Sequence, residues 1–487
     1  MQRSWTTFGR ALHLELPSGA ARRRAIEGAI RDAIRAGKLR LGTELPSSRA
    51  LARDLGLSRG TVVEAYGQLV AEGYLASRMG SGTVVAWATA TRERRRDAIP
   101  REPDPARFSF RSGRPDVASF PRAAWIRALR GALARAPDRA LDYGEARGRP
   151  ELREALADYL GRARGLAASA GDLVVTNGFG QGLLLLGQAL KAAGARQVAV
   201  EDPSGAEVRD VIRAAGLAAR PIPVDSEGLV TAELGAADAA VVLTPAHQYP
   251  LGVTLSPARR AAVVAWARAH QALVIEDDYD GEFRYDRQPV GALQALDPAR
   301  VVYAGTVSKV LAPGVRLGWL ALPSPWARRV ASLKALADGQ APVLDQLAMA
   351  ELIRSGAFER HLRRAGKEYR RRRDKLLARV AERAPGFEPT GIAAGLHLLL
   401  RLPAEGPREA EVEAACLARG VAVTGLRAFA VRQAGDRGGL VVGYASPPPN
   451  AFDAAVTALV EGLADACRSV PPVAPASGPR AAGAHPP

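Results

Sequence analysis

A polar, proline-containing stretch near residue 100 divides the sequence into two parts that do not share one hydrophobic core. From Thr89 to Arg107 the chain contains the run Arg-Glu-Arg-Arg-Arg and three prolines. Such a segment has little apolar surface to bury and is typical of a linker. The 487 residues are therefore expected to form an N-terminal domain over 11–86, a linker over 87–107, a large domain over 108–465 and a disordered Pro/Ala/Gly-rich tail over 466–487.

The balance of charged residues favours an anionic partner. The sequence has 67 Lys and Arg against 50 Asp and Glu, a formal net charge of +17, and its first 100 residues carry 17 basic and 9 acidic side chains. An excess of this kind attracts polyanions such as DNA. However, the high Arg, Ala and Gly content of the whole chain also fits the codon usage of a GC-rich genome. Charge by itself therefore does not establish a nucleic-acid partner.

Composition excludes several other classes of protein. The two cysteines, Cys416 and Cys467, do not suffice for a disulfide framework or a Cys-rich metal site, and we expect no bound metal. No apolar run approaches the ~20 residues of a membrane span. The first ten residues contain no apolar stretch of signal-peptide type after a basic one. We therefore expect a cytoplasmic protein without a membrane partner.

The N-terminal segment has the order of elements found in a winged helix-turn-helix. Apolar residues at helical spacing predict a helix over 20–37, a second over 49–55 capped by Ser48, and a third running from a Ser58 cap to about residue 72. Residues 74–86 alternate like two short strands around a Met-Gly-Ser-Gly turn. The expected core residues of this domain are Leu51, Leu55, Val62, Ala65, Leu69 and Leu75.

The third helix is the expected DNA-contacting element. In a helix-turn-helix the second helix of the pair lies in the major groove, where its first residues meet base edges. Arg59 can bind guanine or phosphate there, and Thr61 can contact a phosphate or a thymine methyl group. Backbone N–H groups at the helix start also favour phosphate. The predicted DNA-binding residues are Arg49, Ser58, Arg59, Thr61 and, in the wing, Arg78, Ser81 and Thr83.

This segment closely resembles the winged helix of GntR-type regulators. The resemblance covers about residues 11–86 and rests on Pro-Ser-Ser-Arg at 46–49, Ser-Arg-Gly-Thr-Val at 58–62 and Glu-Gly-Tyr-Leu at 72–75, in that order. One departure is Gly60, where the family usually presents a polar residue, often Asn. Glycine weakens a helix and the change affects base preference. The alternative for this domain is a helical protein-interaction module.

The larger C-terminal part predicts an α/β domain. Short apolar runs alternate with helical stretches, an order typical of a mostly parallel sheet. The segment from about 331 to 463 alternates helices with fewer strands and is expected to form a smaller α+β lobe. The predicted strands are Leu173–Thr176, Gln197–Val200, Ala240–Leu243, Leu273–Glu276 and Val301–Ala304.

A lysine after the last of these strands suits covalent binding of an aldehyde. Lys309 has hydroxyls one and three residues before it, at Ser308 and Thr306, and Arg316 lies seven residues on. The amine would condense with the aldehyde while the hydroxyls and the guanidinium bind a phosphate. By itself such a lysine is more often a surface charge.

Two further segments strengthen this interpretation. Asp277 and Tyr279 end the preceding predicted strand, and a buried carboxylate is what a protonated pyridinium nitrogen needs as a partner. Tyr279 would bond the ring hydroxyl. The Gly-rich loop over 176–182 joins a strand to a helix and can bring backbone N–H groups to a phosphate. Acidic strand ends and Gly-rich loops are each common without a ligand.

Together with residues 244–252, these segments resemble fold-type I aminotransferases over about 108–462. More particularly, the chain is similar to the MocR subfamily of GntR regulators, which join this domain to a winged helix in this order. The resemblance implies a homodimer that binds pyridoxal 5'-phosphate as an internal aldimine on Lys309. It also implies a set of cofactor-binding residues: Phe179, Gly180, Gln248 (or His247), Asp277, Tyr279, Thr306, Ser308, Lys309, Arg316 and, reaching the phosphate of the partner subunit, Tyr143.

The expected function is that of a transcription regulator. By resemblance it binds an operator in double-stranded DNA and responds to pyridoxal phosphate or to a small amino-type effector. Two departures concern the effector pocket: Ser204-Gly205 stands where relatives carry an aromatic residue, and Val441 stands where aminotransferases carry the arginine that grips a substrate carboxylate. Arg432 and Arg437 are nearby but out of register. Efficient transamination is therefore not expected.

Three alternatives remain at this point. The first is a working aminotransferase with an appended DNA-binding module, which the missing arginine disfavours. The second is a regulator whose large domain is only a dimerisation scaffold, which the intact lysine and its neighbours disfavour. The third is a nonspecific nucleic-acid binder, whose affinity would depend steeply on salt.

Overall fold

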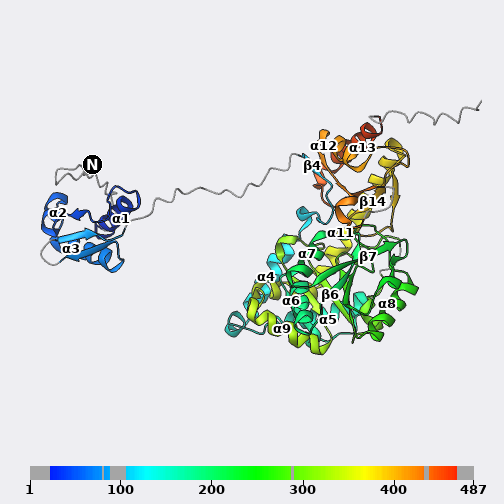
Figure 1. Cartoon of the computed structure of the whole chain (residues 1–487), viewed down its shortest axis with the longest axis horizontal. Coiled ribbons are helices and arrows are strands. Elements are labelled where there is room, and N and C mark those ends of the chain that lie inside the picture. Colours follow the sequence, from blue (N-terminus) through cyan, green and yellow to red (C-terminus); the bar gives the residue numbers. More distant parts are fainter. Residues whose placement is uncertain (1–21, 79–81, 88–105, 287–289, 433–437, 469–487) are drawn as a thin grey trace, which may run out of the picture. The chain divides into compact units, whose positions relative to one another are not determined.

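The chain divides into two compact units, one within residues 1–103 and the other within residues 104–487 (Figure 1). The computed structural model describes residues 22–78, 82–87, 106–286, 290–432 and 438–468. Most of the predicted linker, and the predicted tail beyond Arg468, lie outside these ranges. Within them, no helix is both long and apolar enough to cross a bilayer.

The N-terminal unit packs three helices on a small antiparallel sheet, which is the predicted winged helix-turn-helix. The six predicted core side chains are all buried in one cluster, so this prediction is confirmed. A short first strand, which the sequence did not predict, completes the sheet in the order β1-β3-β2. The elements are α1 (Arg22–Arg35), β1 (Glu44–Leu45), α2 (Ser48–Leu55), α3 (Arg59–Ala71), β2 (Leu75–Arg78) and β3 (Gly82–Val85).

A serine caps the N-terminus of each helix of the helix-turn-helix pair. Ser58 caps α3 as predicted, because its Oγ accepts the backbone N–H of Thr61 at 3.2 Å. The cap predicted for α2 was wrong by one residue. Ser47, not Ser48, accepts the N–H of Ala50 at 3.2 Å, and the helix begins at Ser48. Two adjacent serines are equally good caps by type, and only the backbone angles decide between them.

The C-terminal unit is built on an eight-stranded sheet in the order β5-β12-β11-β10-β9-β6-β7-β8. Figure 1 labels β6 and β7 within this sheet. Strands β11, β10, β9, β6 and β7 are parallel, and β12 and β8 pair antiparallel to their neighbours. The predicted α/β class is therefore confirmed, and all five predicted strands are present. The bounds are β5 (Leu173–Thr176), β6 (Gln197–Asp202), β7 (Ala218–Asp225), β8 (Gly228–Leu229), β9 (Asp238–Leu243), β10 (Leu273–Asp278), β11 (Val301–Thr306) and β12 (Gly318–Ala321).

Helices cover both faces of this sheet. Along β5, Leu173 and Val175 pack into one hydrophobic cluster with α5 and α10, whereas Val174 packs into another with α6 and α9. Strands buried on both faces read as continuous apolar runs, which is why the sequence revealed them. The helices of this layer are α4 (Arg122–Arg135), α5 (Pro150–Arg164), α6 (Phe179–Ala192), α7 (Ala206–Ala214), α8 (Pro257–Ala269), α9 (Ser324–Ala337) and α10 (Val343–Arg354).

The smaller α+β lobe follows the sheet in sequence, as predicted, but it begins later than the expected residue 331, because α9 and α10 pack against the large sheet. Its four strands pair in the order β13-β14-β17-β16, and β15 pairs with β4 at the start of the unit. Helix α13 continues to Arg468, past residue 465, where the domain was expected to end. The elements are β4 (Phe108–Ser109), α11 (Ala357–Arg383), β13 (Glu388–Thr390), β14 (Leu398–Arg401), α12 (Glu409–Ala418), β15 (Val421–Ala422), β16 (Thr424–Gly425), β17 (Gly439–Val442) and α13 (Phe452–Arg468).

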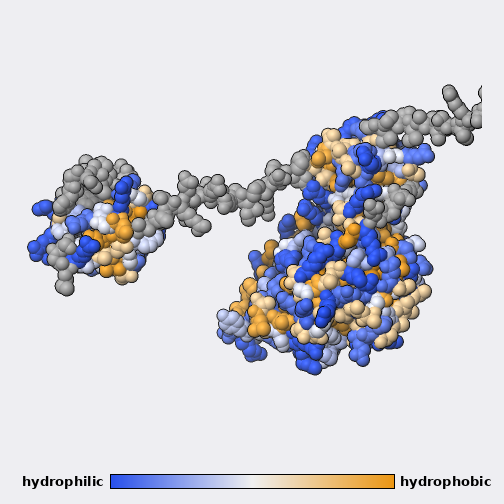
Figure 2. Space-filling model, viewed as in Figure 1, coloured by the Kyte–Doolittle hydropathy of each residue, from blue (hydrophilic) through white to orange (hydrophobic). Residues whose placement is uncertain are grey.

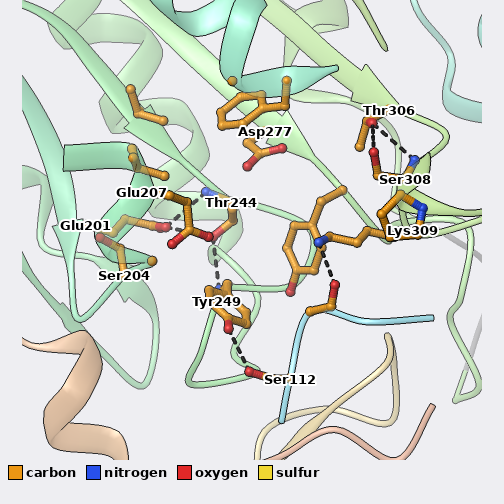
Figure 3. A pocket seen from close by; sticks show the side chains of 18 of the residues that line it. Ser112, Glu201, Ser204, Glu207, Thr244, Tyr249, Asp277, Thr306, Ser308 and Lys309 are labelled. Carbon is orange, nitrogen blue, oxygen red and sulfur yellow. Dashed lines mark hydrogen bonds between the residues drawn. The ribbon is translucent and has the colours of Figure 1, made fainter. Parts of the chain in front are cut away.

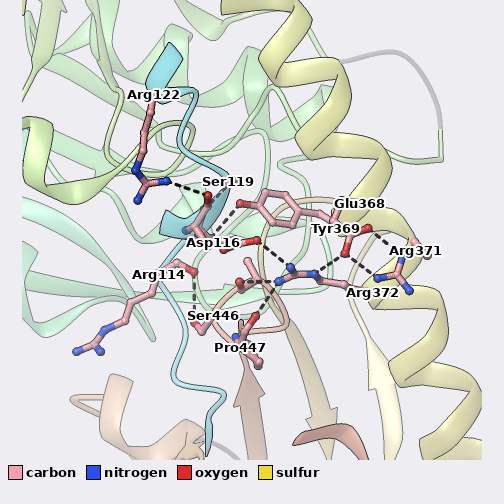
Figure 4. A network of polar contacts seen from close by, with 12 residues as sticks. Arg114, Asp116, Ser119, Arg122, Glu368, Tyr369, Arg371, Arg372, Ser446 and Pro447 are labelled. Atoms are coloured by element: carbon pink, nitrogen blue, oxygen red, sulfur yellow. Dashed lines mark hydrogen bonds and ion pairs between the residues drawn. The ribbon is translucent and has the colours of Figure 1, made fainter. Parts of the chain in front are cut away.

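Arg372 on α11 joins three segments that are far apart in the sequence (Figure 4). Its side chain is fully buried, and its guanidinium donates to Asp116 Oδ2 at 2.8 Å. It also donates to the backbone carbonyls of Ala445 and Pro447, both at 3.0 Å. Glu368, one turn earlier on α11, accepts from Nε at 2.8 Å. The segment around Asp116 and the chain that follows β17 are therefore both held against α11.

Replacing Arg372 with methionine should lower the free energy of unfolding of the C-terminal unit by about 3–5 kcal/mol, because the buried Asp116 carboxylate loses its counter-charge. Urea unfolding followed by circular dichroism measures this. Arg371, whose side chain is 54% exposed, provides the matched control. Arg371→Met should cost less than about 1 kcal/mol, and equal losses in the two variants would contradict the role assigned to Arg372.

Candidate functional sites

A cavity of about 420 Å³ lies beyond the carboxyl ends of the parallel strands in the C-terminal unit (Figure 3). This edge of an open α/β sheet is where ligands bind. The wall combines the ends of β9, β10 and β11 with the starts of α6 and α7 and with residues 112–114. Eight of the ten predicted cofactor residues line it, namely Phe179, Gly180, Asp277, Tyr279, Thr306, Ser308, Lys309 and Arg316.

Lys309 follows β11 and extends into this cavity. Its Nζ donates to the carbonyl oxygen of Gly113 at 2.7 Å. Burial lowers the pKa of the Lys309 amine, and the carboxylates of Asp277 and Glu207 act in the opposite direction. An amine with a lowered pKa holds more of its neutral, nucleophilic form near neutral pH. Lys309 is therefore suited to react with a carbonyl group.

Asp277 supplies a carboxylate without a protein partner. It lies near the end of β10 and makes no hydrogen bond or ion pair with any described residue. Burial raises the pKa of Asp277 well above its usual range, although the charge of Lys309 opposes this. Such a carboxylate stabilises a cation brought by a ligand, such as a protonated ring nitrogen. Tyr279 lines the same cavity, and its hydroxyl donates to the carbonyl of His247 at 3.0 Å.

An anion-binding corner closes one end of the cavity. Gly178 precedes α6 with φ of 93°, and a Cβ there would lie 3.2 Å from Arg316 Nη2, so glycine lets the guanidinium reach the helix start. Arg316 donates to the carbonyl of Asn177 at 2.7 Å. Thr306 Oγ1 donates to Ser308 Oγ at 3.0 Å. The helix start, two hydroxyls and a guanidinium together suit a phosphate.

Two predicted cofactor residues do not line the cavity. Gln248 is buried, and its amide donates to two backbone carbonyls at 2.9 and 2.8 Å, so its polar atoms are already used by the protein. His247, the alternative for that role, is also absent from the wall and pairs with Asp280 at 3.0 Å. Tyr143 is 97% exposed. It contributes nothing to the cavity of its own chain.

Several residues of the wall were not predicted. Glu201 accepts from Thr244 Oγ1 at 2.6 Å, and burial raises the pKa of its carboxyl to about 7. Arg114 lines the wall from the start of the unit. The only sequence feature around it is Gly-Arg-Pro-Asp, a pattern typical of a turn. Glu207 lines the wall from the first turn of α7 and had no sequence signal at all.

Strand β17 brings no cation to the cavity. Val441, at the position expected for a carboxylate-binding arginine, is buried in a small cluster of apolar side chains. Arg432 pairs instead with Glu233 at 3.3 Å, and Arg437 lies outside the described residues. The missing arginine noted in the sequence is thus matched in the structure, where Val441 packs among apolar side chains.

The start of α3 presents the predicted DNA-contacting side chains. Arg59 is exposed on the first turn of α3, and Arg49 is exposed on the first turn of α2. The hydroxyls of Ser58 and Thr61 lie 2.8 Å apart, so one of them holds the other in place. This arrangement suits a helix that enters a groove with its N-terminal end.

The wing contributes fewer described groups. Arg78 is exposed at the end of β2, and Thr83 is half-buried on β3, one residue beyond the paired Arg78 and Gly82. Ser81 lies outside the described residues. Arg78 is therefore the wing cation whose placement supports a backbone or minor-groove contact.

Comparison with known proteins identifies the family. Residues 22–85 match the family of bacterial regulatory proteins called gntR, and residues 108–459 match aminotransferase class I and II. The chain is 36% identical over 420 residues to the HTH-type pyridoxine biosynthesis transcriptional regulator PdxR of Corynebacterium glutamicum, covering 86% of this chain and 90% of that one. The chain is a gntR-family regulator with an aminotransferase-type domain.

Two further comparisons support this family assignment, one for the regulator as a whole and one for its large domain. The chain is 33% identical over 370 residues to the probable rhizopine catabolism regulatory protein MocR of Rhizobium meliloti, covering 72% of this chain and 75% of that one. It is also similar to the crystal structure of kynurenine aminotransferase from Pyrococcus horikoshii in complex with PMP, with a TM-score of 0.66 and 27% identity over 74% of this chain and 91% of that one. The predicted MocR type is confirmed.

The cofactor of this kind of domain is pyridoxal 5'-phosphate, and the cavity fits it. The Lys309 amine, the unpartnered Asp277 carboxylate and the corner formed by Arg316 match the aldehyde, the ring nitrogen and the phosphate of that molecule. When bound, the cofactor supplies an aldehyde carbon that reacts with amines and an electron-poor ring.

Proposed function

We propose that this regulator holds pyridoxal phosphate covalently on Lys309, and that the bound cofactor, or an amino-type effector that reaches the same cavity, changes its affinity for an operator in double-stranded DNA. The observation that carries the proposal is a buried lysine amine in one cavity with the unpartnered carboxylate of Asp277. The unpartnered carboxylate has little structural use without a ligand, because burying a charge without a partner costs free energy.

Regulation requires that the ligand distinguish two states of the protein. It must bind the DNA-competent and the DNA-incompetent state with different affinity. The Corynebacterium relative is named for pyridoxine biosynthesis, which supports the cofactor itself as one signal. A regulator of this family acts on the DNA of the bacterial cell, and we therefore place it in the cytoplasm.

Sensing suits this cavity better than transamination does. An aminotransferase must orient the carboxylate of an amino acid at the reacting carbon, and near-attack geometry contributes much of its rate. The expected strand position holds Val441, which packs among apolar side chains. We therefore expect only slow transamination when an amino donor is added, and we assign the regulator no catalytic role.

We also propose that two copies associate through the face formed by α4, the turn after it and the start of α10. Exposed apolar side chains of large size gather there, which is unusual for a surface that stays in water. Gln340 Nε2 donates to the carbonyl of Asp142 at 3.3 Å, which joins the two segments of the face. Figure 2 shows hydrophobic residues over this part of the C-terminal unit. The residues concerned are Ile126, Leu133, Leu141, Tyr143 and Leu344.

Purified protein mixed with pyridoxal phosphate should show the visible absorbance band of the covalent cofactor–lysine linkage, and Lys309→Ala should lack it. Lys191→Ala, which removes an exposed amine on α6, is the matched control and should keep the band. Absence of the band from wild type, Lys191→Ala and Lys309→Ala alike would overturn the proposed function and leave the large domain as a scaffold.

The same band should form faster as the pH rises, because only the neutral Lys309 amine attacks the aldehyde. Burial lowers the pKa of this amine below 10.5, so the rate should level off below that pH. The Asp277 carboxylate raises the pKa of Lys309. Its removal in Asp277→Asn should therefore shift the rate profile to lower pH. A profile that levels off at the pH of a free lysine would contradict this account.

Arg59→Ala should weaken binding to DNA selected from a random pool by about tenfold, the loss expected for one specific arginine contact. Fluorescence anisotropy at several salt concentrations measures it. A base contact predicts relaxed sequence preference, whereas a phosphate contact predicts a salt slope smaller by about one. Arg24→Ala on α1 removes the same charge outside the helix-turn-helix pair. A loss as large in that control would show that only net charge matters.

Sedimentation of the full chain should give the mass of a dimer at micromolar concentration. Leu133→Asp places a charge on the proposed face and should shift the equilibrium to the monomer, since an unpaired charge at an interface costs several kcal/mol. Leu417→Asp, on an exposed site of α12, should leave the dimer intact. A dimer insensitive to Leu133→Asp would place the interface elsewhere.

A further inference from the structure

Two opposite charges in the cavity are left over after the cofactor has been accommodated. Lys309, Asp277 and Arg316 match the aldehyde, ring nitrogen and phosphate, and Glu201 is bonded by Thr244. The remaining charged side chains of the wall are Arg114 and Glu207. Neither forms a hydrogen bond or an ion pair through its side chain within the described part of the chain.

Arg114 stands next to the end of the strand that lacks the expected arginine. Ser446, which follows β17, donates from its Oγ to the carbonyl oxygens of Arg111 at 2.9 Å and Arg114 at 3.3 Å (Figure 4). A Cβ on Gly443 would lie 2.6 Å from the carbonyl oxygen of Arg111, so the strand end and this segment are in close contact. The backbone of Arg114 is thus fixed beside β17. Its guanidinium can supply the cation that Val441 does not.

Glu207 occupies the opposite part of the wall. Gly205 stands directly before α7, and a Cβ there would lie 2.6 Å from Glu207 Oε1. The carboxylate therefore fills the space beside Gly205. Figure 3 shows Glu207 beside Thr244, on the side of the cavity that also holds Glu201. The Glu207 side chain is exposed to solvent and lines the wall of the cavity.

We infer that Arg114 and Glu207 select the effector: a ligand with a carboxylate, a second ammonium group and the amine that meets the cofactor. An amino acid with an amino group on its side chain has this chemistry. Arg114 binds the carboxylate, and Glu207 binds the side-chain ammonium. Charge-assisted hydrogen bonds of this kind are the strongest that side chains offer. The inference rests on the proposed cofactor site, since the effector reaches these residues only within that cavity.

The same two charges disfavour other classes of amine. An acidic amino acid would bring a second carboxylate toward Glu207, and like charges repel. A diamine leaves Arg114 without a partner, and an aliphatic amino acid leaves Glu207 without one. Arg114 and Glu207 do not neutralise each other, because no ion pair joins them in the described part of the chain.

Calorimetric titration of the full chain loaded with pyridoxal phosphate tests this directly. The probes are L-lysine, L-norleucine, which lacks the side-chain amine, and cadaverine, which lacks the carboxylate. L-lysine should bind at least about tenfold more tightly than either analogue, the effect of one charge-assisted contact. Equal affinity for L-lysine and L-norleucine in the wild-type protein would overturn the assignment of Glu207, and equal affinity for L-lysine and cadaverine would overturn that of Arg114.

Substitutions separate the two contacts. Glu207→Gln should bring the affinity for L-lysine to that of L-norleucine while leaving L-norleucine unchanged. Arg114→Gln should lower the affinity for L-lysine to the affinity for cadaverine. Asp210→Asn on α7 and Arg122→Gln on α4 remove the same charges outside the cavity wall and should change none of the three affinities. Variants that keep the preference for L-lysine would refute the inference even where the visible band shows that the cofactor is bound. Loss of that band in the wild-type protein would instead refute the proposed function.

Discussion

The ion pair between Arg372 and Asp116 is the interaction on which the form of the cavity depends. Asp116 is almost completely enclosed, and a carboxylate in that position is tolerated only with a counter-charge. Its partner comes from the middle of α11, and the same guanidinium holds the chain after β17. Gly113, a few residues before Asp116, receives the hydrogen bond from Lys309. One buried contact therefore determines where the first residues of the large domain meet the end of β11.

The cavity shows how an aminotransferase framework can serve a regulator through a small number of side chains. The groups that match pyridoxal phosphate lie at the end of β10, in the segment that follows β11 and at the start of α6. The groups that we assign to effector selection, Arg114 and Glu207, lie elsewhere on the wall, and Val441 lies on β17.

The sequence predicted most strongly what is periodic or local. The core of the winged helix followed from helical spacing, and five strands of the large sheet followed from continuous apolar runs. β7 was not predicted because Pro221 and Pro223 lie within it, and proline argues against a central strand. β12 was not predicted either; it begins two residues after Arg316, so its apolar residues directly continue the Lys309 motif.

The candidate site was predicted where one motif carries several groups, as around Lys309 and Asp277. It was not predicted where side chains compete for partners over long distances in sequence. Gln248 has the right residue type, but backbone carbonyls already bind its amide. Arg114 and Glu207 reach the cavity from segments whose proximity only the tertiary structure establishes. Residue type identifies a candidate, and burial together with the remaining hydrogen-bonding capacity determines whether it is free to act.

The pairing of β4 with β15 places the start of the large domain beside the cavity. β4 is the first strand of that domain, and Arg114 follows it within a few residues. Gly113, which accepts the hydrogen bond from Lys309, lies in the same short stretch. Residues 112–114 thus line the cavity while the strand just before them is held by the smaller lobe, so one short segment links that lobe to the reactive lysine.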